Sequence, residues 1–272
     1  MMVNFTSELE AIVKTASTLS NMPVEVFHRI IFCSFIKAGL SIYGAQKEQE
    51  IELENLIKTV AAPYRGLVNG KLYLSALRFV KTFNTLLKNS KRATILKEAD
   101  LQYILKFLEN KIGKVDTVFV LDCASIPEII AIASKFSASR RNTTFYEEVF
   151  INPVGITRFL TGQLESFNRE SYLVQYAKLL KERLNANFFT KISKVDLITH
   201  QHGYTLDGFL KSIEMQKLFD HISHFAKQSS VLITSDHGYD VVADEHGLYI
   251  THGYKKECPL NFSRIALFLV ID

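Results

Sequence analysis

The side chains with the clearest potential for chemistry lie in the sequence SDHG at residues 235–238. This segment directly follows the apolar run VLIT, and a THG sequence comes later at residues 251–253. A strand that ends in Asp-His places a carboxylate and an imidazole at its C-terminal end, where open α/β sheets have their ligand sites. Asp and His are ligands that suit zinc, manganese or iron. The pattern therefore indicates metal-dependent chemistry on phosphate esters.

Further candidate ligands follow two other runs that resemble buried strands. The run TVFVL at residues 117–121 ends at an aspartate, and the run VDLIT at residues 195–199 is followed by HQHG and a further aspartate. Because the C-terminal ends of parallel strands lie along one edge of a sheet, we expect these side chains to converge there. The candidate metal ligands are Asp122, His200, His202, Asp207, Asp236, His237 and His252.

Several of these residues also have purely structural interpretations. Asp122 can cap the helix expected after it, and Asp207 can be the N-cap of a helix that begins at residue 208. His200 and His202 can be solvated loop histidines. The Asp-His pair of the SDHG segment fits a metal site best, because it follows directly on an apolar strand.

The elements that must position these residues begin with a helical region. Apolar residues in the first third of the chain recur at a spacing closer to 3.6 than to 2. Pro23 stands at a favoured helix start. The expected helices cover residues 7–19, 24–38, 47–60, 72–87 and 99–110. We expect residues 1–112 to form a helical N-terminal domain.

From residue 115 onward, apolar β-branched runs alternate with helical segments. This alternation indicates a mostly parallel sheet with helices on both faces. The expected strands cover residues 117–121, 143–150, 195–199, 231–234 and 265–271, and the expected helices cover residues 127–135, 170–183 and 208–227. We expect residues 113–272 to form one α/β domain.

Composition narrows the class of protein. Of the 272 residues, 47% are hydrophobic and 22% are charged, which favours a globular chain with a sizeable core over disorder. The net charge of +4 permits an anionic substrate and does not indicate nucleic acid. We expect no secretory signal and no membrane span. The three separated cysteines indicate no disulfide framework and favour a cytoplasmic location. We interpret Cys123 and Cys258, which adjoin candidate site residues, as packed thiols.

The order of the candidate residues resembles the alkaline phosphatase superfamily, and most closely its PglZ-type domains. The resemblance covers about residues 115–272 and implies a three-layer α/β sandwich with a mostly parallel sheet. It implies one metal ion on Asp122, Asp236 and His237. The HG at residues 252–253, with ECPL at residues 257–260, is similar to the family element that leads into the last strand.

The same resemblance implies a second metal ion, held by His252 and a mid-chain pair. Family members often have an aspartate followed four residues later by histidine, but Asp207 is followed at that spacing by a lysine. His200 or His202 is therefore expected to pair with Asp207. The expected cofactor is zinc, or alternatively manganese, as one or two ions.

A threonine or serine nucleophile is also implied. The family places it in a turn after the second strand, and the sequence NPVGITRFLTG at residues 152–162 is similar to that segment. Thr157 fits best, and Ser125 is the alternative. Arg158 would bind a phosphate oxygen as a bidentate donor. The carboxylates expected to orient the imidazoles are Asp240, Asp244 and Glu245.

The resemblance implies a metal-dependent phosphoesterase that hydrolyses a phosphomonoester or phosphodiester through Thr157. The expected partner is a phosphate-ester small molecule or a nucleotide. An alternative is a catalytically weak or inactive PglZ-like module that acts through protein partners in a defence or signalling system, with the N-terminal helices as the docking region. A third interpretation is a phosphate-transferring mutase. These three interpretations predict different catalytic turnover, so an activity assay distinguishes them.

Overall fold

The computed structural model describes residues 5–19, 21–43, 47–64, 70–89, 97–164, 171–201, 205–245, 247–253 and 261–272. Within these ranges the chain is an α/β protein around a five-stranded central sheet of order β2-β9-β5-β1-β4. Strands β4, β1 and β5 are parallel neighbours, whereas β9 runs antiparallel to both β5 and β2. The expected α/β class with a mostly parallel sheet is confirmed.

The sheet strands are short and largely apolar. They are β1 (Thr117–Leu121), β2 (Thr143–Phe145), β4 (Phe188–Ile192), β5 (Val231–Thr234) and β9 (Leu269–Ile271). Two small pairs accompany them, β3 (Phe150–Ile151) with β8 (Ile265–Ala266) and β6 (Asp240–Asp244) with β7 (Gly247–Thr251). The expected strand at 143–150 is therefore divided into β2 and β3, and the expected last strand at 265–271 into β8 and β9.

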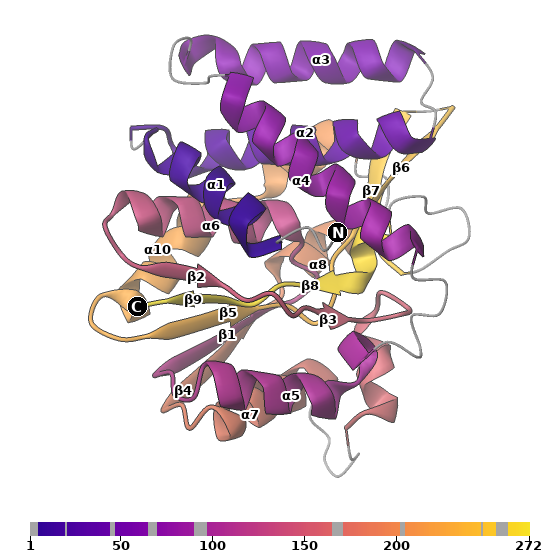
Figure 1. Cartoon of the computed structure of the whole chain (residues 1–272). Helices are drawn as coiled ribbons and strands as arrows, with labels where there is room; N and C mark the ends of the chain where they lie inside the picture. The colour runs from indigo at the N-terminus through magenta and orange to yellow at the C-terminus, as the bar shows by residue number, and fades with distance from the viewer. Residues whose placement is uncertain are drawn as a thin grey trace.

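Helices cover both faces of the sheet (Figure 1). On one face lie α1 (Phe5–Ser17), α2 (Val24–Tyr43), α4 (Gly70–Asn89), α6 (Ile126–Ala138) and α10 (Met215–Ala226), with α3 (Lys47–Ala61) outermost. On the other face lie α5 (Leu101–Lys111) and α7 (Tyr172–Arg183). Two short helices, α8 (Lys194–His200) and α9 (Leu206–Ser212), follow β4.

The alternation of side chains along each strand explains why both faces are covered. In β1, Phe119 and Leu121 join the core beneath α6, whereas Val118 and Val120 join the core beneath α5 and α7. Successive side chains of a strand point to opposite faces, so an all-apolar strand is stable only when both faces are covered. Burial of every β1 side chain fits this requirement.

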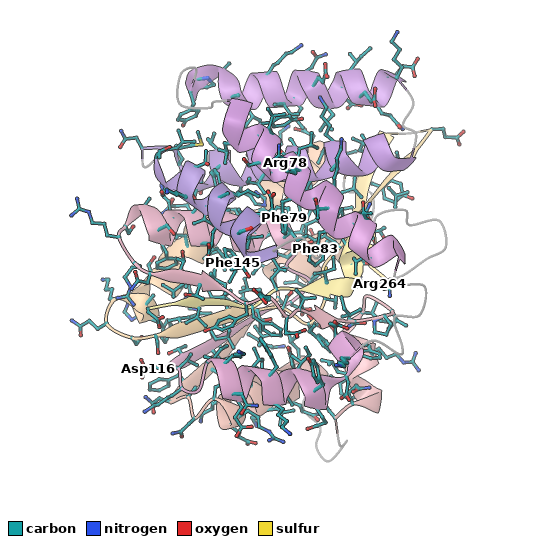
Figure 2. All side chains as sticks on the ribbon, in the orientation of Figure 1. Arg78, Phe79, Phe83, Asp116, Phe145 and Arg264 are labelled. Atoms are coloured by element: carbon teal, nitrogen blue, oxygen red, sulfur yellow. The ribbon has the colours of Figure 1, made fainter. Side chains whose placement is uncertain are left out.

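The N-terminal helices share a core with the α/β part of the chain. Helices α1 and α2 pack on α6, and α4 packs on α1 and α2. Figure 2 shows Phe79 and Phe83 on the side of α4 that faces the sheet, and both rings are buried. Helix α5 packs on the opposite sheet face with α7. The helices of residues 1–112 therefore flank the sheet on both sides.

One expected strand is wrong. Residues 195–199 lie in helix α8, and the strand that pairs with β1 is β4, seven residues earlier. Val195 and Ile198 are buried three positions apart, while Leu197 is 57% exposed, which is a helical pattern. Strand β4 lies at the sheet edge, where its partial exposure makes its sequence less apolar than that of a central strand.

A buried polar cluster joins the N-terminal helices to the end of strand β5. Glu128 of α6 accepts hydrogen bonds through Oε1 from Tyr239 Oη at 2.7 Å and lies 2.7 Å from His28 Nε2 of α2. Its Oε2 accepts from the Ser125 backbone N–H at 2.9 Å. His28, Glu128 and Tyr239 are all buried. One carboxylate therefore holds helix α2, the start of α6 and the segment that follows His237.

Replacing Glu128 with glutamine is expected to lower the free energy of unfolding by about 2 kcal/mol, because buried donors lose a charged acceptor. Urea unfolding would measure this loss. The matched control is Glu54→Gln, which removes a half-exposed ion pair with Lys37 and should cost less than about 1 kcal/mol. Equal losses in the two variants would show that the buried cluster contributes no more to stability than an exposed ion pair.

None of the helices within the described ranges has the length and apolar character needed to cross a lipid bilayer.

Candidate metal centre

The residues that follow three neighbouring parallel strands lie at one edge of the sheet. Asp122 follows β1, and its backbone N–H donates to the carbonyl of Ile192 at the end of β4 at 2.9 Å. Helix α8 begins two residues after β4. Asp236 and His237 follow β5. The order β4-β1-β5 places these three strand ends side by side, which is the geometric reason that their polar residues converge.

Asp122, Asp236 and His237 form a first group, called here the inner cluster. All three are buried, and one possible ligand atom from each lies within 4.8 Å of the others. Asp122 Oδ1 is buried and has no hydrogen-bond partner among the described residues. Burial, and then the Asp236 carboxylate nearby, raise the pKa of Asp122 above its usual range. A bound cation would offset both the desolvation of Asp122 and its repulsion from the Asp236 carboxylate, so the cluster fits a divalent metal ion.

The imidazole of His237 is oriented by its own backbone. His237 Nδ1 lies 2.8 Å from the Gly238 carbonyl, which can only accept, so Nδ1 carries the proton. Nε2, on the other side of the ring, lies 3.6 Å from Asp236 Oδ2. A backbone carbonyl that fixes the tautomer in this way is typical of metal-ligating histidines.

Thr157 contacts the inner cluster. Its hydroxyl donates to Asp236 Oδ2 at 2.6 Å and lies 3.4 Å from His237 Nε2. Thr157 is the first residue of a six-residue 3₁₀ helix that extends to Gly162. The fold therefore brings Thr157 to Asp236 and His237, two expected ligands that lie about 80 residues later in the chain.

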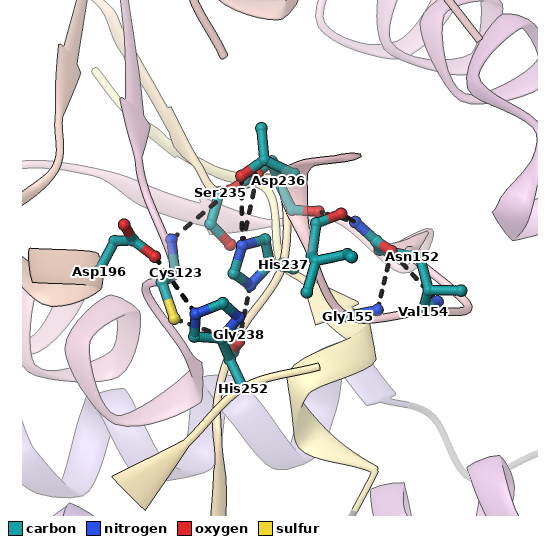
Figure 3. A network of polar contacts seen from close by, with 12 residues as sticks. Cys123, Asn152, Val154, Gly155, Asp196, Ser235, Asp236, His237, Gly238 and His252 are labelled. Carbon is teal, nitrogen blue, oxygen red and sulfur yellow. Dashed lines mark hydrogen bonds and ion pairs between the residues drawn. The ribbon is translucent and has the colours of Figure 1, made fainter. Parts of the chain in front are cut away.

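Asn152 holds the turn that precedes Thr157, and Figure 3 shows its contacts with Val154 and Gly155. Its Oδ1 accepts from the Gly155 backbone N–H at 2.9 Å, and its Nδ2 donates to the carbonyls of Ile156 at 2.8 Å and Asp236 at 3.2 Å. Gly155 has φ of 62°, and a Cβ there would lie 2.8 Å from Ser263 Oγ. The buried amide thus aligns the Thr157 turn with the segment that carries Asp236.

Asp196, His200 and His252 form a second group, called here the outer cluster. His200 Nε2 lies 3.0 Å from His252 Nε2 and 3.3 Å from Asp196 Oδ1, and His252 Nε2 lies 3.6 Å from the same oxygen. Ligands at zinc distances in a tetrahedron are separated by about 3.3 Å. The spacing of the three atoms is therefore close to that of three zinc ligands.

The two clusters adjoin each other. The rings of His237 and His252 stack with their centroids 5.1 Å apart. Figure 3 shows Asp236 close to the His237 ring and Asp196 linked to the His252 ring. Two groups of possible metal ligands therefore lie next to each other, and the Thr157 hydroxyl contacts the first of them.

Asp196 is the site residue that the sequence interpretation missed. A strand at residues 195–199 would have placed it in the middle of that strand, but helix α8 directs it toward His200 one turn later. The signal was present, because Asp196 and His200 have the same four-residue separation that was sought after Asp207. The i, i+4 positions of a helix lie on one face, which brings both side chains into the outer cluster.

One expected ligand, Asp207, is not part of either cluster. Asp207 lies in the first turn of α9, with its side chain 61% exposed, and pairs with Lys211 at 2.6 Å. The N-cap of that helix is Thr205, which accepts from the Gly208 N–H, so Asp207 is not the cap either. His202 lies outside the described residues.

Ser125, the alternative nucleophile, and Arg158, the residue expected to bind a phosphate oxygen, have different surroundings from Thr157. Ser125 is the buried N-cap residue of α6, and its Oγ lies where a Cβ on Gly238 would approach to 2.9 Å. Arg158 is exposed beside Thr157 in the 3₁₀ helix. Thr157, rather than Ser125, is the hydroxyl that contacts the inner cluster.

Asp240 has a different role from the expected orientation of an imidazole. It is buried, and its two oxygens accept from the Phe262 backbone N–H at 2.9 Å and from Ser263 Oγ at 2.6 Å. It therefore holds the 3₁₀ turn at Phe262–Arg264. Burial raises the pKa of Asp240 to about 6, although these hydrogen bonds oppose the shift. Glu245 is exposed, and the side chain of Asp244 lies outside the described residues.

A pH effect on stability follows from Asp240. Since its folded-state pKa of about 6 exceeds the usual 3.8, the folded protein retains a proton that the unfolded chain has lost between those values. Its contribution is present below about pH 4 and is lost as the pH rises through 6, by about 3 kcal/mol in total. Relative to Asp240→Asn, the unsubstituted protein should therefore lose stability from pH 4 to pH 7 in urea unfolding. A difference that does not change with pH would contradict this assignment.

Comparisons of the chain with protein-family models and with curated proteins find no match.

Proposed function

We propose that this protein is a metal-dependent phosphoesterase that uses Thr157 as its nucleophile, and that it is a member of the alkaline phosphatase superfamily with a PglZ-type domain. The observation that carries the proposal is the 2.6 Å hydrogen bond from the Thr157 hydroxyl to Asp236 Oδ2, within a buried group of metal-compatible ligands. A hydroxyl held against a metal-binding carboxylate is the arrangement that activates a weak alcohol nucleophile.

The residues present fit two cation sites. The inner cluster would hold one ion, and the unpartnered Asp122 Oδ1 supports this assignment. The outer cluster would hold the other, supported by its tetrahedral spacing. A divalent cation such as zinc or manganese would lower the pKa of the attacking hydroxyl and offset the charge on the phosphoryl oxygens.

The chain's own residues would carry the group transfer. The Thr157 hydroxyl loses its proton along the hydrogen bond to Asp236 Oδ2, and its oxygen forms a bond to phosphorus. The bond from phosphorus to the leaving alcohol breaks, and that alkoxide takes up a proton delivered through Asp236 and solvent. Water then attacks phosphorus, the bond to Thr157 breaks, and one proton of the water restores the threonine hydroxyl. The net reaction is hydrolysis of one ester bond.

Arg158 and the surroundings suggest the substrate class. Arg158 is exposed next to Thr157, where it can meet an anionic group that arrives from solvent. A phosphomonoester, a phosphodiester or a nucleotide would all present such oxygens to a bidentate guanidinium. We propose these esters as the substrate class.

The experiment is hydrolysis of 4-nitrophenyl phosphate and bis(4-nitrophenyl) phosphate by the purified protein, with zinc or manganese added and with chelator. Turnover that depends on the metal is expected. The Asp236→Ala/His237→Ala double variant should lose it, whereas Asp207→Ala, which removes only an exposed ion pair, should keep it. Full activity in the double variant would disprove the proposal. Metal binding without turnover on either ester would favour the inactive module that acts through protein partners.

A further inference from the structure

A third group of possible metal ligands lies between the two clusters and contains a thiol. Ligand atoms of Cys123, Asp196 and His237 lie within 4.8 Å of one another. Asp196 belongs to the outer cluster and His237 to the inner cluster. Figure 3 shows the Cys123 sulfur directed toward the space beside Gly238 and His252.

Cys123 is packed in the buried core, but its sulfur also has polar neighbours. Its Sγ lies 3.3 Å from the Gly238 carbonyl and 3.8 Å from Thr199 Oγ1, and its backbone N–H points to Asp236 Oδ1 at 3.5 Å. Cys123 is fully buried with φ of 61°, a conformation that is uncommon for a residue with a Cβ. Cys33 belongs to the same core cluster and lies within helix α2.

We propose that Cys123, Asp196 and His237 form a site for thiophilic metal ions that competes with the two carboxylate–imidazole sites. The competition follows from the ligands, because an ion held by Cys123 takes one ligand from each of the other sites. A thiolate selects soft or borderline cations such as cadmium, cobalt or excess zinc over manganese and magnesium. Soft ions would thus exclude the ions that occupy the inner and outer clusters.

Binding at this site releases a proton. Cysteine binds metal ions as the thiolate, so the Cys123 thiol must lose its proton. When an ion binds, the S–H bond breaks, the proton passes to the buffer and a metal–sulfur bond forms. No oxidant or reductant is needed.

The test is optical titration of the full chain with cadmium and, separately, with cobalt. A thiolate-to-metal charge-transfer band is expected in the ultraviolet for the unsubstituted protein, Cys33→Ser and Cys258→Ser. Cys123→Ser should lack the band and bind cadmium about 100-fold more weakly, since even indirect perturbation of a metal ligand costs 10- to 100-fold. A band that persists in Cys123→Ser, or its absence from the unsubstituted protein, would overturn the proposal.

Competition between metal ions gives a second readout that does not depend on an absorption band. Manganese bound to the unsubstituted protein should appear as free manganese by electron paramagnetic resonance when cadmium is added. In Cys123→Ala, whose fold can be verified by circular dichroism, this release should need about 100-fold more cadmium. Equal release in both proteins would overturn the competition. The proposal rests on the two cation sites proposed above but not on catalysis, so failure of ester hydrolysis leaves it testable.

Discussion

Replacement of Thr157 with valine is expected to lower kcat for ester hydrolysis by at least about 10³-fold, because valine keeps the branched shape but removes the nucleophilic oxygen. The inner cluster consists of Asp122, Asp236 and His237, so binding of a divalent ion should persist. Steady-state kinetics on 4-nitrophenyl phosphate together with isothermal titration of zinc would separate the two effects. A quenched reaction of the unsubstituted protein should show phosphate on Thr157 by mass spectrometry.

Ser125→Ala is the matched control, since it removes the other candidate hydroxyl. Ser125 begins helix α6, so its loss should cost about 1 kcal/mol of stability and leave kcat within a few-fold. Loss of activity in Ser125→Ala with retention in Thr157→Val would transfer the nucleophile to Ser125. Retention in both variants would exclude a covalent step at either hydroxyl.

Gly238→Ala is expected to produce the largest loss of stability, about 3 kcal/mol, with weaker metal binding. A Cβ on Gly238 would lie 2.6 Å from the Phe262 carbonyl and 2.9 Å from Ser125 Oγ. Backbone must therefore shift in the segment that carries His237. The Gly238 N–H donates to the Ser263 carbonyl at 3.0 Å, and its own carbonyl accepts from His237 Nδ1, so the shift would disturb the imidazole orientation.

Gly162→Ala is the control for this substitution, because a Cβ on Gly162 meets nothing within 4 Å. Its effect on stability should be within about 0.5 kcal/mol. Urea unfolding and zinc titration of both variants would test the contrast. An equal urea midpoint for Gly238→Ala and Gly162→Ala would show that the close approach at Gly238 does not affect stability.

The apolar runs predict much of the sheet correctly. Strands at residues 117–121 and 231–234 agree with β1 and β5, because central strands buried on both faces need continuous apolar sequence. The edge strand β4 gave no such signal, since Phe188 is 63% exposed. The β-branched run that follows it was then misinterpreted as a strand, although Val195 and Ile198 have helical spacing.

The hairpin of β6 and β7 was not predicted at all. It begins at Asp240 and ends at Thr251, so it connects the segment that carries His237 to His252. Its residues alternate only in part between buried and exposed, and Asp240 is a buried carboxylate in a position where sequence rules expect exposure. The hydrogen bonds from Phe262 and Ser263 make that burial possible, and they come from a part of the chain about 20 residues away.

By itself, the sequence determined the α/β class and the Asp-His pair after β5, together with Asp122 and His252 as candidate ligands. These features depend on local patterns, namely apolar runs and the polar residues that end them. Only the tertiary structure decided that Asp196 replaces Asp207, that Thr157 lies against Asp236, and that Cys123 lies between the clusters. Each of these depends on distances between segments that are far apart in the chain, which the packing of β4, β1 and β5 brings to one edge of the sheet.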